Sequence, residues 1–221
     1  YLSPEKYSGT ELRFLSHTTR ERKGRRWSRQ IVWQGHLSFT DNRANEGSGL
    51  GGILNFGYGV HRNWAFMGGK LNVKAGGLID ANLGFLYNTR NGNNPAQAKA
   101  DVSLMPSVAA AYRFRLWDKS FMVRYEAAVP LVGLMFSPNY GQSYYEIFSQ
   151  GNYDHNIIPT TIVSTPSLRH MLTLDFSLLK TTFCVGYLGD YRQADVNNLK
   201  SHAYTHAFVI GVVRRFSTLK L

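Results

Sequence analysis

Seven histidines are the residues of this chain that most invite a catalytic or metal-binding interpretation. His202 and His206 stand four residues apart, so on a β-strand both side chains fall on one face. That face is apolar, and His170 also falls in an apolar phase. No acidic residue stands at a diagnostic spacing, no motif marks a nucleophilic serine, and two histidines alone do not make a zinc site. The sequence therefore predicts neither an enzyme nor a metal or cofactor.

The charge balance is strongly basic, with a formal net charge of +11, and Cys184 is the only cysteine. One cysteine excludes an internal disulfide and a multi-cysteine metal site. Basic residues are scattered along the chain without a nucleic-acid motif, so the expected polyanion is a lipid headgroup, including lipopolysaccharide, and not nucleic acid. We expect contact with lipid phosphates or a partner at a basic run before Trp27; a solvated turn is the alternative. The run comprises Arg20, Arg22, Lys23, Arg25 and Arg26.

A second set of charged residues alternates with apolar residues along the chain. If the chain forms a narrow barrel, these side chains point inward, where charges must be paired or hydrated. We therefore predict a salt-bridged interior, with a transport pathway as the alternative. The main members of this predicted network are Lys70, Asp101, Arg113, Arg124, Glu126, Arg169 and Asp175.

The long polar segment 137–165 is the best candidate for a binding surface. It is rich in aromatic residues, which a disordered loop would lack, and segments of this length are usually functional or disordered. Docking to a protein partner is the favoured interpretation, with a lid over the barrel mouth or a glycan site as alternatives. The aromatic residues expected to make the contact are Tyr140, Tyr144, Tyr145, Phe148 and Tyr153.

Strict alternation of apolar and polar residues is the dominant pattern of the whole chain. From Trp27 to Phe39, for example, apolar side chains occupy mostly the odd positions. The mean hydropathy of −0.26 is that of a soluble protein, and no apolar run approaches the ~20 residues that a spanning helix needs. A barrel with an apolar outside and a polar inside reconciles both observations. We predict an all-β fold: a single antiparallel up-and-down transmembrane β-barrel with long extracellular loops. A soluble lipocalin-like barrel is the alternative.

The apolar phase changes parity at Arg62-Asn63, at residues 117–120 and at Leu179-Lys180, which predicts tight turns there. Longer polar connections at 41–47, 89–99, 137–165 and 192–200 form the opposite end, so the tight turns are assigned to the periplasm. Eight strands are favoured, with residues 64–88 as one long strand. Ten remain possible if residues 75–77 form a turn. The predicted parts are an N-terminal periplasmic arm or extra first strand (1–26), the barrel (27–216) and a C-terminal tail (217–221).

The opening Tyr1-Leu2-Ser3-Pro4, followed by Tyr7-Ser8-Gly9-Thr10 and the strand from Trp27, resembles a family of uncharacterised small outer-membrane proteins of the Bacteroidota type. The motif covers the first ten residues and the barrel pattern covers the rest. The last strand, closing on Phe216, also resembles the C-terminal assembly signal of bacterial outer-membrane proteins, although five residues follow it. The resemblance implies a location in the outer membrane of a Gram-negative bacterium and transfers no catalytic residues.

Together these observations predict an integral outer-membrane barrel without enzymatic activity. The favoured function is a structural or accessory subunit of a larger outer-membrane protein assembly, such as a barrel-insertion or nutrient-uptake machine. A small pore or transporter is the first alternative, and a lipid-modifying enzyme is the second. The expected partners are membrane lipids and other outer-membrane proteins.

Overall fold

A computed structural model describes residues 5–22, 26–90, 95–139 and 141–216. It is 74% strand and 4% helix, which confirms the all-β prediction. No helix in these ranges is long and apolar enough to cross a membrane. The strands are β1 (Tyr7–Glu21), β2 (Trp27–Asn42), β3 (Ser48–Phe66), β4 (Leu71–Asn88), β5 (Ala96–Leu116), β6 (Lys119–Ala128), β7 (Val132–Phe136), β8 (Ile157–Thr161), β9 (Leu168–Leu178), β10 (Thr181–Val196) and β11 (Leu199–Val213).

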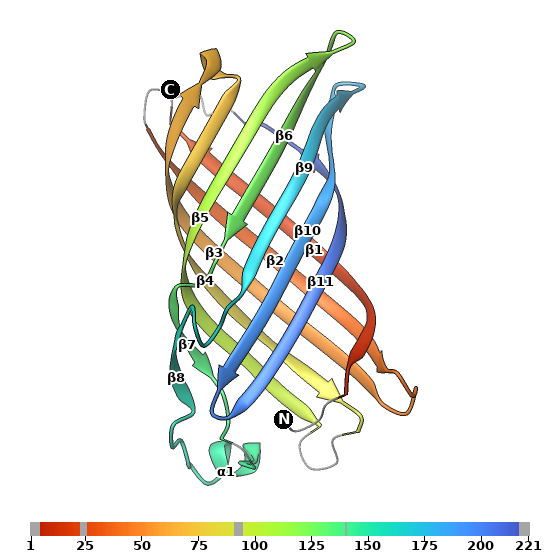
Figure 1. Ribbon diagram of the computed structural model, residues 1–221, viewed down its shortest axis with the longest axis vertical. Coiled ribbons are helices and arrows are strands. Elements are labelled where there is room, and N and C mark those ends of the chain that lie inside the picture. The colour runs from red at the N-terminus through yellow and green to blue at the C-terminus, as the bar shows by residue number, and fades with distance from the viewer. Residues whose placement is uncertain (1–4, 23–25, 91–94, 140, 217–221) are drawn as a thin grey trace.

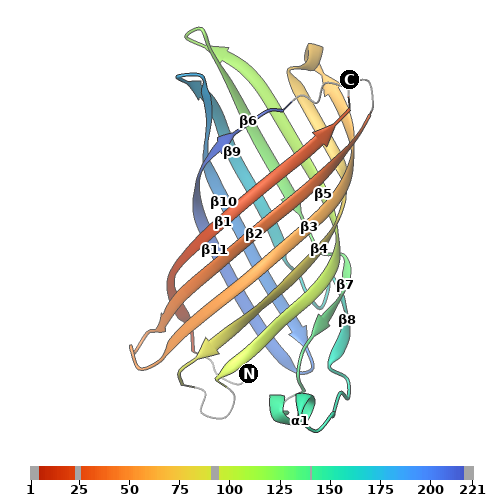
Figure 2. The same cartoon turned by 180° about the vertical axis from the view of Figure 1, so that it is seen from behind.

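The strands form one antiparallel sheet that curls into a nearly closed barrel (Figures 1 and 2). Along the sheet the order is β1-β2-β3-β4-β5-β6-β9-β10-β11, so successive strands run up and down. The short strands β7 and β8 branch from this path, because β7 pairs with the first part of β5, beyond the point where β6 has ended. The predicted up-and-down topology is therefore confirmed.

Side-chain alternation explains why this sequence forms a barrel. On β4, Ile79 and Leu83 point outward and are 58% and 65% exposed, whereas Asp80 and Asn82 between them are buried. The same division holds on neighbouring strands, so the interior is polar and the outer wall is apolar. A soluble protein has the reverse arrangement, with its apolar residues inside.

The two ends of the barrel differ, as predicted. At the tight-turn end, two-residue turns at Trp117-Asp118 and Leu179-Lys180 have positive φ at both positions, the type I′ geometry that suits a hairpin. At the opposite, long-loop end lie residues 43–47, residues 89–90 and the segment between β6 and β9, which contains β7, the short helix α1 (Tyr144–Phe148) and β8. The predicted long connection at 192–200 is wrong, because β10 and β11 join there through the tight turn Asn197-Asn198.

The predicted count of eight strands is too low. In the described residues, nine strands follow one path, and the first of them, Tyr7–Glu21, occupies most of the predicted N-terminal arm. Residues 217–221, the predicted tail, lie outside the described residues. The start of β1 lies at the long-loop end, and β1 ends and β2 begins at the tight-turn end.

The predicted turn at Arg62-Asn63 and the single strand 64–88 are also wrong. β3 continues to Phe66, a 3-10 turn at Met67–Gly69 (η1) reverses the chain, and β4 then runs without interruption through Gly76. The apolar phase was misleading because Arg62 points outward with Trp64 and Phe66. Because Arg62 is charged, the alternation of outward apolar residues on β3 looks broken there, before the actual turn at Met67–Gly69.

Candidate functional site

The lumen of the barrel contains the densest group of polar side chains in the described residues. Most of its fully buried residues are polar and come from strands all around the sheet. They include Ser28, Gln34, Asn55, His61, Asp80, Asn82, Ser103, Ser107, Thr173, Asp175 and Asp190.

Ion pairs cross this lumen between strands that are not neighbours in the sheet. Arg169 on β9 donates to Asp80 on β4 at 3.0 Å, and Arg13 on β1 donates to Asp190 on β10 at 2.8 Å. Arg192, also on β10, contacts Asp190 at 3.3 Å. Arg169–Asp80 joins two distant parts of the sheet, whereas Arg192 and Asp190 lie on the same strand, so it is the Arg169 guanidinium that lies across the interior.

Amide side chains connect these ion pairs into one network. Asn55 accepts a hydrogen bond from Gln34 at 2.9 Å and donates to Asp80 at 2.8 Å. Asn82 donates to Asp101 at 3.0 Å and accepts from Arg192 at 3.1 Å. Buried polar groups need such partners, so the network satisfies polar side chains inside the lumen and stabilises the barrel.

The structure places five of the seven predicted network residues in the interior. Arg124 contacts Asp175 at 3.3 Å, Glu126 lies 3.5 Å from His17, and Asp101 and Arg169 take part in the contacts above. The other two, Lys70 and Arg113, are exposed at the tight-turn end. Lys70 directly precedes β4, and Arg113 lies near the end of β5.

Three residues that the sequence interpretation missed, Arg13, Asp190 and Arg192, also belong to the network. Arg13 lies in the segment that was expected to be an arm, and Asp190 and Arg192 lie where β10 was expected to end. A sequence signal did exist: Asp190 and Arg192 are two residues apart, so both share the inward phase of Leu188.

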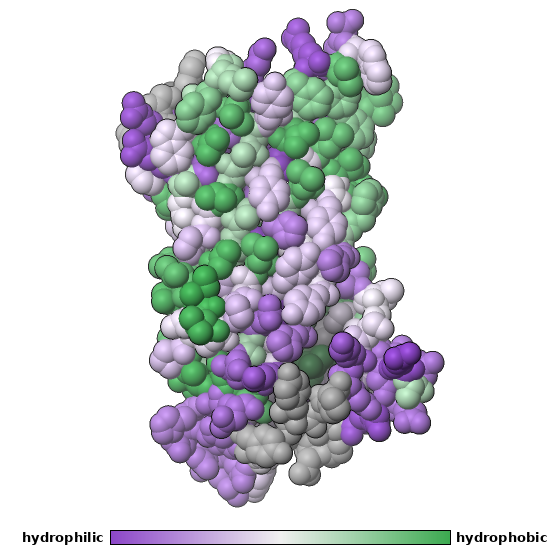
Figure 3. Space-filling model, in the orientation of Figure 1, coloured by the Kyte–Doolittle hydropathy of each residue, from purple (hydrophilic) through white to green (hydrophobic). Residues whose placement is uncertain are grey.

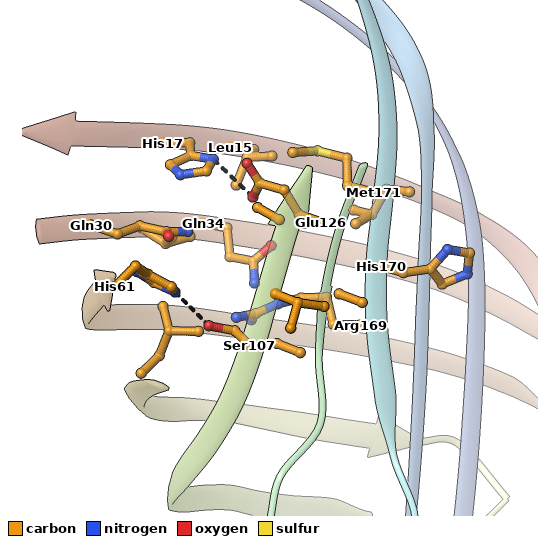
Figure 4. Close-up of a pocket in the computed structure, with 17 residues that line it drawn as sticks. Leu15, His17, Gln30, Gln34, His61, Ser107, Glu126, Arg169, His170 and Met171 are labelled. Atoms are coloured by element: carbon orange, nitrogen blue, oxygen red, sulfur yellow. Dashed lines mark hydrogen bonds and ion pairs between the residues drawn. The ribbon is translucent and has the colours of Figure 1, made fainter. Parts of the chain in front are cut away.

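A small cavity remains beside the network, lined by residues of β1 to β6, β9 and β10 (Figure 4). Its volume is about 60 Å³, enough for a few water molecules. The Nε2 atom of His61 lies 2.6 Å from the Ser107 hydroxyl, an arrangement typical of a base and a nucleophile. The other ring nitrogen of His61 has no hydrogen-bond partner in the described residues, so no carboxylate orients the ring.

No group of three or more metal-ligating side chains occurs in the described part of the chain. In the part of the chain that the structure describes, no third side chain is hydrogen-bonded to His61 beside Ser107. The arrangement of the lumen is suited to closing the barrel.

The segment after β7 forms a structured cap at the long-loop end. The hydroxyl of Ser143 accepts the Glu146 N–H, and the Glu146 carboxylate accepts the Ser143 N–H at 2.7 Å, a capping box that starts α1. The Ser143 backbone and hydroxyl hydrogen bonds lower the pKa of Glu146. Tyr144 stacks on Phe148 and accepts the Ala98 N–H at 2.7 Å, so α1 is tied to β5.

Of the predicted docking residues, Tyr145, Phe148 and Tyr153 are exposed, whereas Tyr144 is partly buried in the contact with β5. Tyr140 lies outside the described residues. Ile147 is completely buried and anchors the helix. The segment is therefore an ordered surface that presents aromatic side chains to the exterior.

A family model described as "Protein of unknown function (DUF3316)" matches residues 1–221. The chain belongs to this family. No curated protein matches the sequence, and no solved structure matches the fold at a significant level. The DUF3316 description supplies no activity, so function has to be argued from the geometry of the barrel.

The basic run of this DUF3316 protein lies at the tight-turn end. Arg20, Arg22 and Arg26 are exposed there, and the predicted contacts Lys23 and Arg25 lie outside the described residues. Strand pairing adds two arginines that the sequence interpretation missed. Arg29 stands directly opposite Arg20. The Arg62 guanidinium lies over the Trp64 ring, 5.5 Å from its centre. Like charges on paired strands repel, so this outward cluster suits an anion.

Proposed function

We propose that the protein is an integral β-barrel of the bacterial outer membrane and serves as an accessory subunit of a larger outer-membrane assembly. The observation that carries this proposal is the closed lumen. Arg169 reaches Asp80 and Arg192 reaches Asn82 from distant strands of the sheet, so paired side chains occupy the interior. We therefore assign the function to the outer surface of the barrel, through its contacts with lipid and with other proteins.

The apolar outer wall supports the membrane placement. Strands β2 to β5 expose a continuous series of large apolar side chains that a soluble protein would bury. Closed barrels satisfy all backbone groups between strands, which is why they can cross a bilayer. Members of this apolar wall include Trp33, Leu37, Phe39, Leu54, Ile79, Leu83, Phe85, Leu104 and Val108.

The outward arginines at the tight-turn end support contact with lipid phosphates. Arg29 and Arg62 stand on the adjacent strands β2 and β3, just beyond the apolar wall, where headgroups of the inner leaflet would lie. Each basic residue at an anionic membrane surface contributes on the order of 1 kcal/mol to binding.

The α1 segment is the proposed contact with a protein partner on the cell surface. It is held in place before any partner binds, by the capping box and by the Tyr144–Ala98 contact. A preformed surface loses little conformational entropy on binding. Exposed tyrosines are also frequent at the centre of protein interfaces.

Native electrophoresis and affinity capture from gently solubilised outer membranes test the proposal. We expect the wild-type chain to migrate well above its own 25.0 kDa, and a Tyr145→Ser/Tyr153→Ser variant to migrate as a free barrel. Leu179→Ser is the control, because it removes an even more exposed apolar side chain at the opposite end. A wild-type chain that migrates alone in native membranes contradicts the accessory role.

A further inference from the structure

The first and last strands of the barrel, β1 and β11, share no backbone ladder among the described residues. Side chains alone bridge this boundary, which we call the seam. The Thr205 hydroxyl on β11 donates to Glu11 on β1 at 3.0 Å, and Arg13 on β1 reaches past β11 to Asp190 on β10. Both strands therefore present a backbone edge that the other strand does not pair.

Unpaired edges matter here because of the proposed membrane location, on which this inference rests. In water, an edge strand is hydrated and only risks unwanted pairing. Within a bilayer no water is available, and open sheet edges do not occur against lipid. Something must therefore complete the hydrogen bonding of β1 and β11.

Strand direction restricts what can fill the seam. The path contains an odd number of strands, so β1 and β11 both run from the long-loop end to the tight-turn end. A second copy inserted in the same orientation offers only edges that run the same way. One additional strand running in the opposite direction is antiparallel to both edges. It also brings the path from nine strands to ten, an even number as in bacterial outer-membrane barrels.

The outer wall beside the seam is polar halfway along the strands, unlike the wall over β2 to β5. The Tyr187 hydroxyl lies 2.5 Å from Nδ1 of His206 and 3.1 Å from the Tyr191 hydroxyl. The ring of His170 lies 5.6 Å from that of Tyr191. These four residues, the tyrosine–histidine patch, surround Gly189 near the middle of β10. Figure 3 shows hydrophilic and near-neutral residues gathered over this part of the wall.

The other side of the seam has the same character. On β1, Leu12 and Phe14 point outward, but the same face continues with Ser16 and Thr18. Hydroxyl and imidazole groups facing hydrocarbon are costly, whereas protein interfaces are rich in tyrosine and hydrogen-bonding groups. Beside the seam the outward faces therefore mix polar groups with exposed apolar side chains, among them Phe14, Phe208 and Ile210, a composition that suits contact with protein.

Two basic residues at one end of the seam indicate the charge that a strand filling the seam has at that end. Arg20 is the penultimate residue of β1 and Arg214 directly follows β11, so both lie at the tight-turn end of the seam. Both are exposed, and neither forms an ion pair with a described residue. We infer that the seam is closed by one β-strand of a second outer-membrane protein, which starts between these arginines with an acidic residue and runs antiparallel to β1 and β11.

Hydrogen–deuterium exchange of the full-length chain tests the inference. The protein is compared in isolated outer membranes and, after purification, in vesicles of phosphatidylethanolamine and phosphatidylglycerol. Amides of β1 and β11 should exchange at least roughly tenfold more slowly in outer membranes, while amides of β4 exchange equally in both. Equal protection means that the seam closes on itself or on a second copy, and equal exposure means that nothing fills it. Either outcome overturns the inference.

A charge reversal tests the identity of the strand. The double variant Arg20→Glu/Arg214→Glu should lose the protection of β1 and β11 in outer membranes and keep that of β4. Arg115→Glu is the control, because Arg115 is the exposed penultimate residue of β5 at the same end of the barrel. Unchanged protection in the double variant overturns the acidic partner strand. If the chain stays in a large complex but its seam closes on itself, only this inference is overturned. If the chain is alone in native membranes, the proposed function is overturned.

Discussion

Asp80 shows how a single buried carboxylate organises the interior of this barrel. It accepts hydrogen bonds from Arg169, Asn55 and Asn82, which come from three different strands. A buried charge is tolerated only when its partners are in place, so the three donors and Asp80 depend on one another. The network is therefore expected to be sensitive to removal of one member and less sensitive to removal of a matched pair.

Replacing Asp80 by alanine should destabilise the folded barrel by about 3–5 kcal/mol, because Arg169 is left buried without its carboxylate. The loss of the folded band on heat-modifiable gels, measured across a urea series in detergent, gives the effect. Asp195→Ala is the control, since its pair with Lys200 is exposed and contributes less than about 1 kcal/mol. The double variant Asp80→Leu/Arg169→Leu should recover part of the lost stability. Equal midpoints for Asp80→Ala and Asp195→Ala would show that the pair is not buried in solution.

The two faces of strand β4 have different surroundings, the polar lumen on one side and the apolar outer wall on the other. Ile79 points outward from the middle of the strand, next to the inward Asp80. If the wall contacts lipid, Ile79→Arg should cost roughly 2–4 kcal/mol and reduce the folding yield into vesicles. Leu179→Arg, in a tight turn beyond the wall, should fold normally. A soluble barrel would tolerate both changes, so an unaffected Ile79→Arg argues against a membrane-spanning wall.

The helix α1 depends on pH through its capping box. The folded-state pKa of Glu146 is lowered, so the charged form stabilises the helix at pH values above the ordinary glutamate pKa of about 4.3. This stabilisation is lost as the pH falls through the lowered pKa. The amide protection factors of residues 144–148, which are corrected for the intrinsic pH dependence of exchange, should therefore fall below about pH 4 in the wild type. Glu146→Gln should weaken that dependence. If both proteins show the same profile, the capping carboxylate does not hold the helix.

The strands and the barrel class could be predicted from the sequence because alternation is a local property. The number of strands could not be predicted in the same way. On β1 the outward positions Ser16 and Thr18 are polar where an apolar phase was expected, and on β3 Arg62 interrupts the apolar phase. These outward polar residues lie on surfaces that we assign to partners. Ser16 and Thr18 lie beside the seam, which we assign to protein, and Arg62 lies among the arginines that we assign to lipid phosphates. The lumen contacts of Arg13 and Asp190 also lay beyond prediction, because they depend on how far the sheet curls.

For the whole molecule, the closed lumen predicts low conductance. The wild-type protein in planar lipid bilayers should show no stable open channel, because side chains from separate walls meet across the interior. Asp80→Ala/Arg169→Ala removes one such crossing pair without leaving a lone charge, and should raise the frequency of conducting events. Steady wild-type channels would favour the pore alternative over an accessory subunit.

The odd number of strands on the path has a topological consequence. Tyr7 begins β1 at the long-loop end, whereas Val213 ends β11 at the tight-turn end. In the proposed orientation, the two termini of the barrel lie in different compartments, with the segment before β1 on the cell surface. An epitope inserted before Tyr7 should bind antibody on intact cells, and one inserted after Val213 only after the outer membrane is permeabilised. The barrel would then connect whatever precedes it at the surface to whatever follows it in the periplasm.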